Sequence, residues 1–401
     1  MNKKNNEMKN LIYILLLCVT TTLYPQGNIT VASGRTMTID ETGSLTVSGD
    51  FTNNGTVTLN STSTAYSSII VSGTATGEIT YNRYVNTQGS DEWDLVGSPV
   101  EGLSIEDFAN DNDGSLATNS SSYAIGSYDN SDDSWSNYTT ASVTGGDEFE
   151  IGQGYQMAHD SGGTLAFTGD IASSAQSFQI TNNADNGSGG RRWNLVANPF
   201  PSYLYGNENA DGTHSFLVVN EEKMDENYLS MYGWDADGGG EYTVYNNLLS
   251  AVYVAPGQAF MIASDAASGE NLSFTQDMRT TSGDDDFIEN NPLNDIYEVL
   301  LRLYHGNQKI KETRLCFKES LSLGLDPGYD AGDYNENAAL MTRLVEGDQG
   351  IGFVINAMST LDMSDVVVPL VINQDAGQEF RVNLHTSTIG EVNIYLEDNQ
   401  A

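Results

Sequence analysis

Trp93-Asp94-Leu95-Val96-Gly97-Ser98-Pro99 is a heptapeptide that returns almost unchanged as Trp193-Asn194-Leu195-Val196-Ala197-Asn198-Pro199. A second match follows, because the stretch 152–157 is answered by the stretch 255–261. The two matches have offsets of 100 residues (193 minus 93) and 103 residues (257 minus 154). A near-constant offset over this distance indicates two tandem copies of one domain. We therefore expect Trp93 and Trp193 to anchor the first buried strand of each copy.

The composition favours an all-β protein with several domains. The chain has 401 residues, and at roughly 100–200 residues per domain this length allows two to four domains. It contains 40 Gly and 21 Tyr but only 16 Lys and Arg. Its apolar segments are short and are separated by Gly, Asn and Asp, which is typical of short strands joined by many turns.

The N-terminus is expected to be a signal peptide that covers residues 1–27. Three lysines precede an apolar run from Leu11 to Val19, which is too short to span a bilayer. An alternative is a lipoprotein that is attached through Cys18. The mature chain is expected to have no membrane-spanning segment and to be secreted or held at the outer cell surface.

The mature chain is strongly acidic. The whole sequence carries a formal charge of −39, and removal of residues 1–27 takes away three Lys and one Glu, which leaves −41. Such a surface repels phosphate backbones and anionic lipids, so nucleic acid is excluded as a partner. Divalent cations fit better, although the charge also explains solubility. Cys316, the one cysteine of the mature chain, lies in an alternating strand pattern and is expected to be a buried small residue.

Residues 28–85 are expected to form a short β-solenoid-like segment. Six alternating apolar pairs, from Ile29 and Val31 to Ile79 and Tyr81, are separated by Gly and Asn at near-regular spacing. Short strands with tight corners suit stacked coils that bury their inward faces on one another. A plain meander is the alternative.

Two related β-sandwiches are expected to follow, over residues 86–180 and 181–280. The first ends at Leu165-Ala166-Phe167 and the second at Leu272-Ser273-Phe274. Neither contains a sustained 3.6-residue periodicity, so antiparallel sandwiches are favoured. One short helix is expected at Ser104 to Phe108, where Ser104 can cap the first turn.

An acidic linker is expected over residues 281–295, and a third β-sandwich over residues 296–401. The linker contains three consecutive aspartates and an Asn-Asn-Pro sequence. The third domain carries most of the basic residues, against an almost purely acidic middle. Its expected strands are 297–304, 313–317, 352–355, 366–371, 380–384 and 392–396.

The sequence offers no recognisable catalytic constellation, so an enzyme is not expected. The four His are isolated from one another, with no His-Glu-x-x-His pair. No Gly-x-Ser-x-Gly elbow and no phosphate-binding glycine loop are present. Carboxylate pairs cannot be assigned, because glycosidase geometry is a test in space.

Three acidic loops are weak candidates for structural calcium, because calcium takes carboxylate and carbonyl oxygens from short Asp/Asn loops. None of them continues to the Glu of an EF-hand, and the alternative for each is a solvated β-turn. The candidate ligands are Asp111, Asp113, Asp235, Asp237, Asp326, Asp330 and Asp333.

Aromatic residues beside Asp/Asn-rich loops raise a glycan hypothesis. Sugar faces stack on aromatic rings, while amides and carboxylates accept or donate to sugar hydroxyls. The alternative is that these rings alternate into the sandwich cores and across neighbouring strands. The candidates are Tyr128, Trp135, Tyr138, Tyr232, Trp234 and Tyr242.

Three motifs carry a resemblance to a known family. Two are the Trp-x-Leu-Val strand and the Gly-x-Gly-Tyr strand. The third and most telling is Phe317-Lys318-Glu319 followed by Gly324-Leu325-Asp326-Pro327-Gly328-Tyr329-Asp330-Ala331. The chain resembles surface and secreted proteins that are exported by the bacterial type IX secretion system. The resemblance implies the type IX machinery as a partner and a place among adhesins or surface-layer proteins. It departs at 392–398, after which such proteins continue into a sorting domain, so we expect this sequence to be a fragment.

The sequence thus predicts a secreted, non-enzymatic cell-surface structural or adhesion protein, with surface glycans or other surface proteins as partners. The alternatives are a carbohydrate-binding accessory protein of a polysaccharide-degrading system and the non-catalytic part of a larger secreted hydrolase. A local function is expected where the two copies differ, at 111–137 and 207–245.

Overall fold

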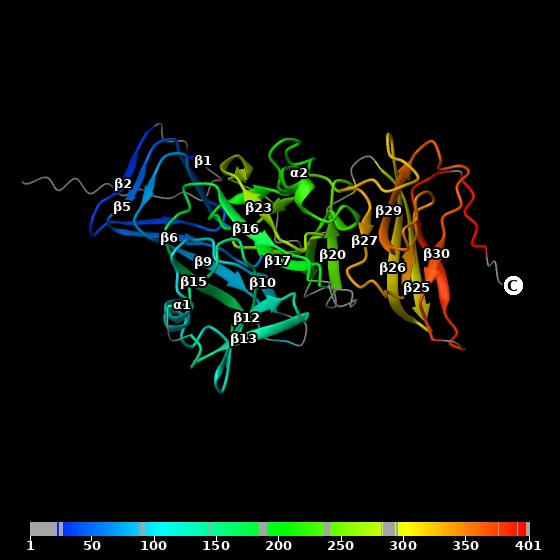
Figure 1. The fold of residues 1–401 in the computed structure, drawn as a ribbon. Coiled ribbons are helices and arrows are strands. Elements are labelled where there is room, and N and C mark those ends of the chain that lie inside the picture. Colours follow the sequence, from blue (N-terminus) through cyan, green and yellow to red (C-terminus); the bar gives the residue numbers. More distant parts are fainter. Residues whose placement is uncertain are drawn as a thin grey trace, which may run out of the picture.

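The computed structural model is all-β, which confirms the expected fold class. It describes residues 22–23, 27–87, 89, 93–143, 146–183, 191–235, 241–281, 283, 293, 296–375, 377–390 and 392–397. Most of the expected signal peptide 1–27, with Cys18, and most of the expected linker 281–295 lie outside these residues. Figure 1 shows the parts in chain order, from a coiled segment at one end to a C-terminal sheet at the other.

Residues 29–85, here the coil segment, form three small parallel sheets. Each strand pairs with the equivalent strand of the next coil, since Ile29 pairs with Phe51 and Phe51 pairs with Ala75. Stacked coils pair in parallel, whereas a meander would pair antiparallel. The strands are β2 (Ile29–Val31), β3 (Thr36–Ile39), β4 (Ser44–Val47), β5 (Phe51–Asn53), β6 (Thr56–Asn60), β7 (Ser68–Val71), β8 (Ala75–Thr76) and β9 (Ile79–Val85), and β1 (Thr22–Leu23) pairs with β4.

Strand β9 belongs both to the coil segment and to the first repeat. It pairs in parallel with β6 and antiparallel with β15 (Gly163–Gly169). One hydrophobic cluster accordingly runs without a break from Val31 to Ile171. The expected boundary at 85–86 therefore falls within a shared core, and the first repeat, here the first unit, begins at β9.

The two repeats share a common series of strands and one α-helix, and the second repeat has additional short strands and 3-10 turns. The first unit comprises β9, β10 (Asp94–Val96), α1 (Ile105–Asp111), β11 (Thr118–Asn119), β12 (Ser122–Asp129), β13 (Ser134–Thr139), β14 (Tyr155–Met157) and β15. The second unit comprises β16 (Gln176–Ile180), β17 (Trp193–Ala197), β18 (Tyr203–Tyr205), α2 (Phe216–Asn220), 3-10 turns at Glu221–Lys223 and Glu226–Tyr228, β19 (Met231–Asp235), β20 (Glu241–Tyr245), β21 (Tyr253–Val254), β22 (Ala259–Ala263), β23 (Glu270–Phe274), a 3-10 turn at Gln276–Met278 and β24 (Arg279–Thr280). Because β16 pairs with β23, the second unit begins before the expected boundary at 180–181.

Strand pairing gives the alignment of the two units. Val96 pairs with Tyr155 in the first unit, and Val196 pairs with Phe260 in the second. Tyr155 and Phe260 are therefore equivalent, and the offset at this strand is 105 (260 minus 155) rather than the 103 that the sequence match suggested. The turn before the strand agrees, since Gly152 and Gly257 both adopt a positive φ, +83° and +66°.

The two units pack on each other through equivalent residues. The amide of Gly97 donates to the carbonyl of Gly257, and the amide of Ala197 donates to the carbonyl of Gly152, each at 2.8 Å. The same contact is thus made twice, as across a two-fold axis. A Cβ on Gly97 would lie 2.3 Å from the Cβ of Ala197, so the first copy requires glycine where the second has alanine.

The short helix that the sequence predicts is confirmed. Ser104 is the N-cap of α1, and its hydroxyl accepts from the amide of Asp107 at 3.0 Å. The helix extends to Asp111 and buries Ile105, Phe108 and Ala109. Phe108 then packs on Phe167 of β15, with ring centroids 4.5 Å apart, so the helix closes one end of the first unit's core.

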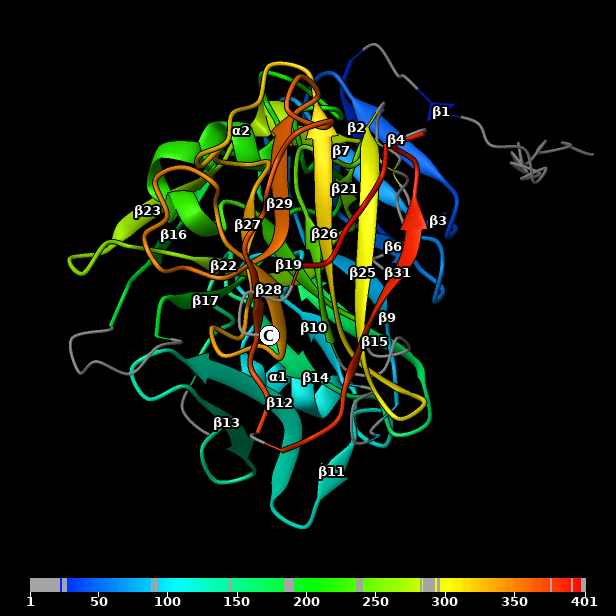
Figure 2. The same ribbon diagram turned by 90° about the vertical axis from the view of Figure 1, so that its right-hand side faces the viewer.

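The third unit, residues 296–397, is a seven-stranded sheet whose face is turned toward the viewer in Figure 2. Cys316 and Ala357 on one face pack against Leu248 of the second unit, while Phe317 and Met358 on the other face are covered by apolar loop residues. Cys316 is fully buried as expected, and burial raises the pKa of its thiol to about 12. The strands are β25 (Tyr297–His305), β26 (Gln308–Lys318), β27 (Ala331–Gly332), β28 (Leu340–Thr342), β29 (Phe353–Ser359), β30 (Leu370–Ile372) and β31 (Arg381–Ser387).

Two of the strands expected in the third unit differ from the structure. The segment 366–371 contributes only its end to β30, and the segment 392–396 is not a strand. Val392 packs against the sheet, but Tyr395 and Leu396 are 84% and 67% exposed. Alternating apolar residues form a strand only where a neighbouring strand pairs with them, and the described sheet ends at β31.

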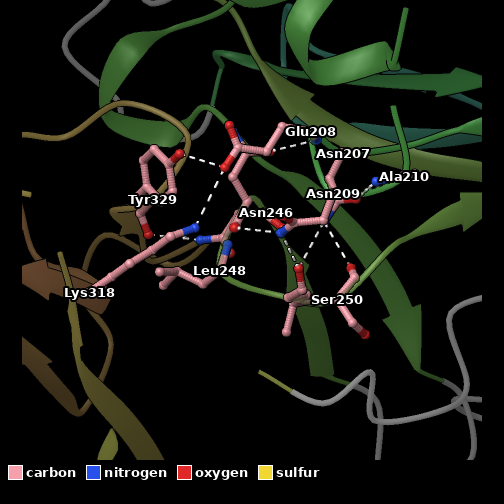
Figure 3. A network of polar contacts seen from close by, with 11 residues as sticks. Asn207, Glu208, Asn209, Ala210, Asn246, Leu248, Ser250, Lys318 and Tyr329 are labelled. Carbon is pink, nitrogen blue, oxygen red and sulfur yellow. Dashed lines mark hydrogen bonds and ion pairs between the residues drawn. The ribbon is translucent and has the colours of Figure 1, made fainter. Parts of the chain in front are cut away.

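A polar network fixes the third unit to the second (Figure 3). The side-chain amide of Asn207 donates to the carbonyls of Asn246 and Ser250, which orders the loop before β21. The side chain of Asn246 donates to the carbonyl of Tyr329 at 2.8 Å. Glu208 accepts from the Tyr329 hydroxyl and lies 3.6 Å from Nζ of Lys318. The stretch 324–331, which carries part of the resemblance to type IX secreted proteins, therefore docks the third unit on the second. We call it the docking loop.

Candidate functional site

The two repeated hairpins carry equivalent aromatic pairs. Tyr128 faces Trp135 across β12 and β13, with ring centroids 5.2 Å apart. Trp234 faces Tyr242 across β19 and β20, with centroids 5.1 Å apart. Opposed side chains on neighbouring strands lie close enough to pack, so the alternation of each strand places both rings on one face. Duplication has therefore produced two aromatic hairpins in one molecule.

The third unit adds an aromatic ring to the second hairpin. Tyr334, which follows the docking loop, stacks on Tyr242 with centroids 4.1 Å apart and an interplanar angle of 28°. It also lies against Trp193, at 4.5 Å. Tyr232 also belongs to the cluster, with its ring centroid 4.7 Å from that of Trp193. Its hydroxyl donates to the carbonyl of Gly332 at 2.8 Å. Residues far apart in the sequence thus form one aromatic cluster.

A cavity of about 660 Å³ lies where the three units meet, and we call it the junction cavity. Asp133 lines it from the hairpin of the first unit, Val244 from the second unit, and Ile310 and Val354 from the sheet of the third unit. Its aromatic lining consists of Trp193, Tyr232, Trp234, Tyr242 and Tyr334. The rings of Trp234, Tyr242 and Tyr334 are only partly buried, so solvent reaches them.

Tyrosine hydroxyls from all three units lie close together beside this cavity. The hydroxyl of Tyr128 donates to Oδ1 of Asp133 at 2.6 Å. The hydroxyl of Tyr334 neighbours those of Tyr128 and Tyr242. Burial raises the pKa of all three phenols, so they stay neutral donors at physiological pH. Asp133 itself adopts a left-handed φ of +59°, a conformation that Asp tolerates better than most residues.

Charged residues form two ion pairs in the wall of the junction cavity. Nζ of Lys311 lies 2.9 Å from Oδ2 of Asp333, a carboxyl that is only 2% exposed. The guanidinium of Arg192 lies 3.1 Å from Oε1 of Glu336 and also contacts the carboxylate of Asp225. These pairs hold the loop 333–336 of the third unit against β17 and β26, and they shape the wall.

One buried donor in the wall has no acceptor. Trp193 lines the junction cavity and is 1% exposed. Among the described residues, its indole Nε1 has no hydrogen-bond partner. A buried N–H without a partner costs free energy, about 1–3 kcal/mol.

The structure brings some of the predicted aromatic residues together and separates others. Trp234, Tyr242 and Tyr232 line the junction cavity, and Tyr128 reaches it through Asp133. Trp135 pairs with Tyr128 but is not part of the lining, and it is 37% exposed.

Tyr138 lies elsewhere. It packs against the core of the first unit, with its ring 6.5 Å from that of Tyr155. For this residue the structure favours the core alternative over the glycan hypothesis. The equivalent position in the second unit is the buried Tyr245, as the pairing of the two hairpins shows.

The predicted calcium ligands do not converge in the described part of the chain, which contains no group of three acidic or other metal-binding side chains. In the docking loop, Asp330 accepts from two backbone amides and Asp326 accepts from Ser322. Asp333, just after this loop, pairs with Lys311.

The other two candidate calcium loops lie in the first and second units. Asp111 ends α1, and it and Asp113 are exposed. Asp237 and the side chain of Asp235 lie outside the described residues.

Sequence reasoning missed Tyr334 and Asp133. Both lie in Asp/Asn-rich loops, Tyr334 within Asp333-Tyr334-Asn335 and Asp133 within Ser131-Asp132-Asp133. The criterion that selected Trp234, an aromatic ring beside an acidic loop, would also have selected Tyr334. Its stacking on Tyr242 could not have been inferred, because that contact depends on how the third unit docks.

Comparisons with known proteins identify a family. The family model described as Domain of unknown function (DUF8693) matches residues 17–401. No curated protein and no solved structure matches the chain. In the described residues, no helix is long and apolar enough to cross a membrane.

Proposed function

The chain belongs to the DUF8693 family, and we propose that it is an exported, non-enzymatic cell-surface protein that mediates adhesion by binding carbohydrate. The observation that supports this proposal is the junction cavity, with its five aromatic rings and its neighbouring tyrosine hydroxyls. Binding sites for small ligands are concave, mostly apolar and supplied with a few fixed polar groups. The junction cavity is concave and joins five aromatic rings to fixed polar groups, but its surface is more polar than is usual for such sites.

The geometry of the rings suits a sugar. The apolar face of a pyranose packs on aromatic rings, and its hydroxyls need donors and acceptors at the rim. Trp234 is a partly exposed ring that Tyr242 supports edge-on, and Asp133 offers a carboxylate that is held in place by Tyr128.

The arrangement of charges favours binding over catalysis. A glycosidase needs two carboxyl groups that face the scissile bond, one of which transfers a proton. Asp333 and Glu336 are each within ion-pair distance of a cation, Lys311 and Arg192. Carboxylates that are held in this way are suited to structure rather than to proton transfer.

Export and surface attachment rest on the sequence of residues 1–27 and on the resemblance to type IX secreted proteins. We propose that the type IX machinery carries the chain across the outer membrane. Fractionation of the producing cells with an antibody against the chain tests this. Detection in the outer membrane or the medium supports export, and confinement to the cytoplasm contradicts it.

A carbohydrate-binding accessory protein of a polysaccharide-degrading system is the second candidate, and the same cavity supports it. The two candidates differ in the glycans that they bind. An adhesin should bind glycans of cell surfaces, whereas an accessory protein should bind the polysaccharide that its partner enzymes degrade. A glycan array that contains both classes separates them.

The test of carbohydrate binding compares one tryptophan from each of the two equivalent hairpins. On the array, Trp234→Ala should lose binding, because Trp234 lines the junction cavity. Trp135→Ala is the matched control, since Trp135 lies on the equivalent hairpin outside the lining and should retain binding. Unchanged binding in Trp234→Ala would contradict the proposal.

A second variant guards against loss of folding. Ala339 lines the junction cavity and is partly exposed, so Ala339→Trp adds a large ring to the wall without removing a core residue. It should abolish glycan binding while the thermal melting temperature stays close to that of the wild type. Full binding by this variant would place the sugar outside the cavity.

A further inference from the structure

The lining of the junction cavity contains more negative than positive side chains. Among the described residues, Asp133, Asp333 and Glu336 line it, against a single ammonium group, that of Lys311. Lys311 lies 2.9 Å from Asp333 and neutralises that carboxylate. Asp133 and Glu336 are the other two carboxylates of the lining.

Arg192 compensates Glu336 only in part. Its guanidinium contacts Asp225 as well as Glu336, so one positive charge serves two carboxylates. Asp133 accepts its hydrogen bond from the hydroxyl of Tyr128, which is a neutral donor. Among these described residues, Asp225 and Glu336 therefore share one guanidinium while Asp133 has only a neutral donor, and the wall of the cavity carries an excess of negative charge.

The aromatic lining narrows the kind of ligand. The face of an aromatic ring is negative, so the partly exposed Trp234 attracts a cation as well as an apolar sugar face. Tyr242 packs edge-on against Trp234 and holds that ring in place. The cavity thus combines a place for a positive charge with an apolar surface for a sugar ring.

We propose that the junction cavity selects an amine-bearing sugar, whose ring stacks on the aromatic residues and whose ammonium group lies near Asp133 and Glu336. The inference rests on the carbohydrate binding proposed above and specifies its chemical class. An acidic sugar is excluded by the same charges, because its carboxylate would face Asp133 and Glu336. A neutral sugar fits the rings but leaves the negative charge without a partner.

The test is a calorimetric titration of the full chain with two oligosaccharides of equal length, a glucosamine tetramer and a glucose tetramer. The titration is run at a pH at which the amines are protonated. The glucosamine tetramer should bind about tenfold more tightly, the effect of one charge-assisted hydrogen bond. Because partly exposed charges are screened, this preference should shrink as salt is added.

A pair of variants on one hairpin ties the preference to the cavity. Asp133→Asn removes the charge, while Asn tolerates the same left-handed φ. It should reduce the ratio of the two affinities several-fold, because it weakens binding of the glucosamine tetramer more than binding of the glucose tetramer. Asp132→Asn is the matched control, because Asp132 is the exposed neighbour outside the lining, and it should keep the full preference.

Three results would overturn the inference. Equal affinity for the two tetramers would show that the charge plays no part, although carbohydrate binding itself would stand. Tighter binding of a galacturonate tetramer than of the glucosamine tetramer would show that the cavity prefers a negative ligand. Binding of neither tetramer, while the array detects another sugar, would refute the amine class and leave the proposed function intact.

Discussion

At Gly97 the two repeated units approach so closely that a methyl group does not fit. An added Cβ would lie 2.3 Å from the Cβ of Ala197 and 2.6 Å from the carbonyl oxygen of Gln153. Neither neighbour is the end of a flexible side chain, so the backbones of the two units would have to move apart. The sequence shows a Gly and an Ala at equivalent positions of the heptapeptide, but only the packed structure shows why they differ.

Gly97→Ala should therefore destabilise the protein by about 1–3 kcal/mol, the usual cost of overpacking. Urea denaturation measures this as a lower free energy of unfolding. Gly212→Ala is the control, because Gly212 is exposed and an added Cβ there meets only one atom, at 3.7 Å. The control should change stability by less than about 0.5 kcal/mol. Equal effects in the two variants would contradict the proposed contact.

Asp330 predicts a pH dependence of stability. It is 0% exposed, and its carboxylate accepts from the amides of Asp326 and Ala357. Burial raises its pKa from 3.8 to about 7, although both amides act to lower it. Between about pH 4 and pH 7 the folded state therefore holds a proton that the unfolded state has released, so stability falls as the pH rises through this window.

The size of this effect follows from the shift in pKa. A shift of three units corresponds to roughly 4 kcal/mol lost between pH 4 and pH 7. Asp330→Asn should flatten this part of the profile, when free energies of unfolding are measured by urea denaturation at several pH values. Asp265→Asn, which removes an exposed carboxyl, controls for the change in net charge. Parallel profiles for wild type and Asp330→Asn would refute the assignment.

At the scale of elements, one asparagine ties the helix of each unit to a later strand, β15 in the first unit and β23 in the second. Asn112 donates to the carbonyls of Phe108 and Ala166 and accepts from the amide of Ala166. Asn220 makes the same three bonds, to Phe216 and Ser273. The duplication thus preserves a polar link that the printed sequence does not show, because the matching residues are 108 apart (220 minus 112) rather than 100.

Asn112→Ala and Asn220→Ala should each cost about 2–4 kcal/mol, because each leaves buried backbone groups of the strand without partners. Thermal and urea unfolding measure the loss. Asn110→Ala on the same helix is the control, since Asn110 is exposed and Ala is the better helix former. A cost below about 0.5 kcal/mol for Asn112→Ala would show that the link is not structural.

Some elements of the fold can be predicted from the sequence, and others cannot. The Ser104 cap and the strands around Trp93 and Trp193 follow from local patterns, and the structure contains them. The segment 392–396 alternates equally well but finds no partner strand, because pairing is a property of neighbours and not of the segment itself. The sharing of β9 between the coil segment and the first unit was likewise invisible, since it depends on β15, about eighty residues later.

At the scale of the whole molecule, the docking of the third unit creates the candidate site. Tyr334 and Asp333 reach the junction cavity only because the loop 326–333 packs on the second unit. The sequence could supply Trp234 and Tyr242 as candidates, since they flank an acidic loop. It could not supply the cavity, whose walls come from three units that no local pattern connects.

Gly332 tests this docking. An added Cβ would lie 2.3 Å from the ring of Tyr228, so Gly332→Val should loosen the third unit. We expect a separate unfolding transition in calorimetry and a larger radius of gyration in small-angle scattering. Gly324→Val is the control, because an added Cβ there has only ordinary contacts, at 3.5 Å and beyond. A single transition and an unchanged radius for Gly332→Val would show that the docking does not depend on this contact.

The most direct test of the account is a crystal structure of the full chain with the oligosaccharide that binds best on the array. We expect electron density for a sugar ring in the junction cavity, in van der Waals contact with Trp234 or Tyr242. A polar group of the sugar should lie within hydrogen-bonding distance of Asp133. A sugar that binds only elsewhere, for example on the exposed Trp135, with none in the junction cavity, would contradict the account.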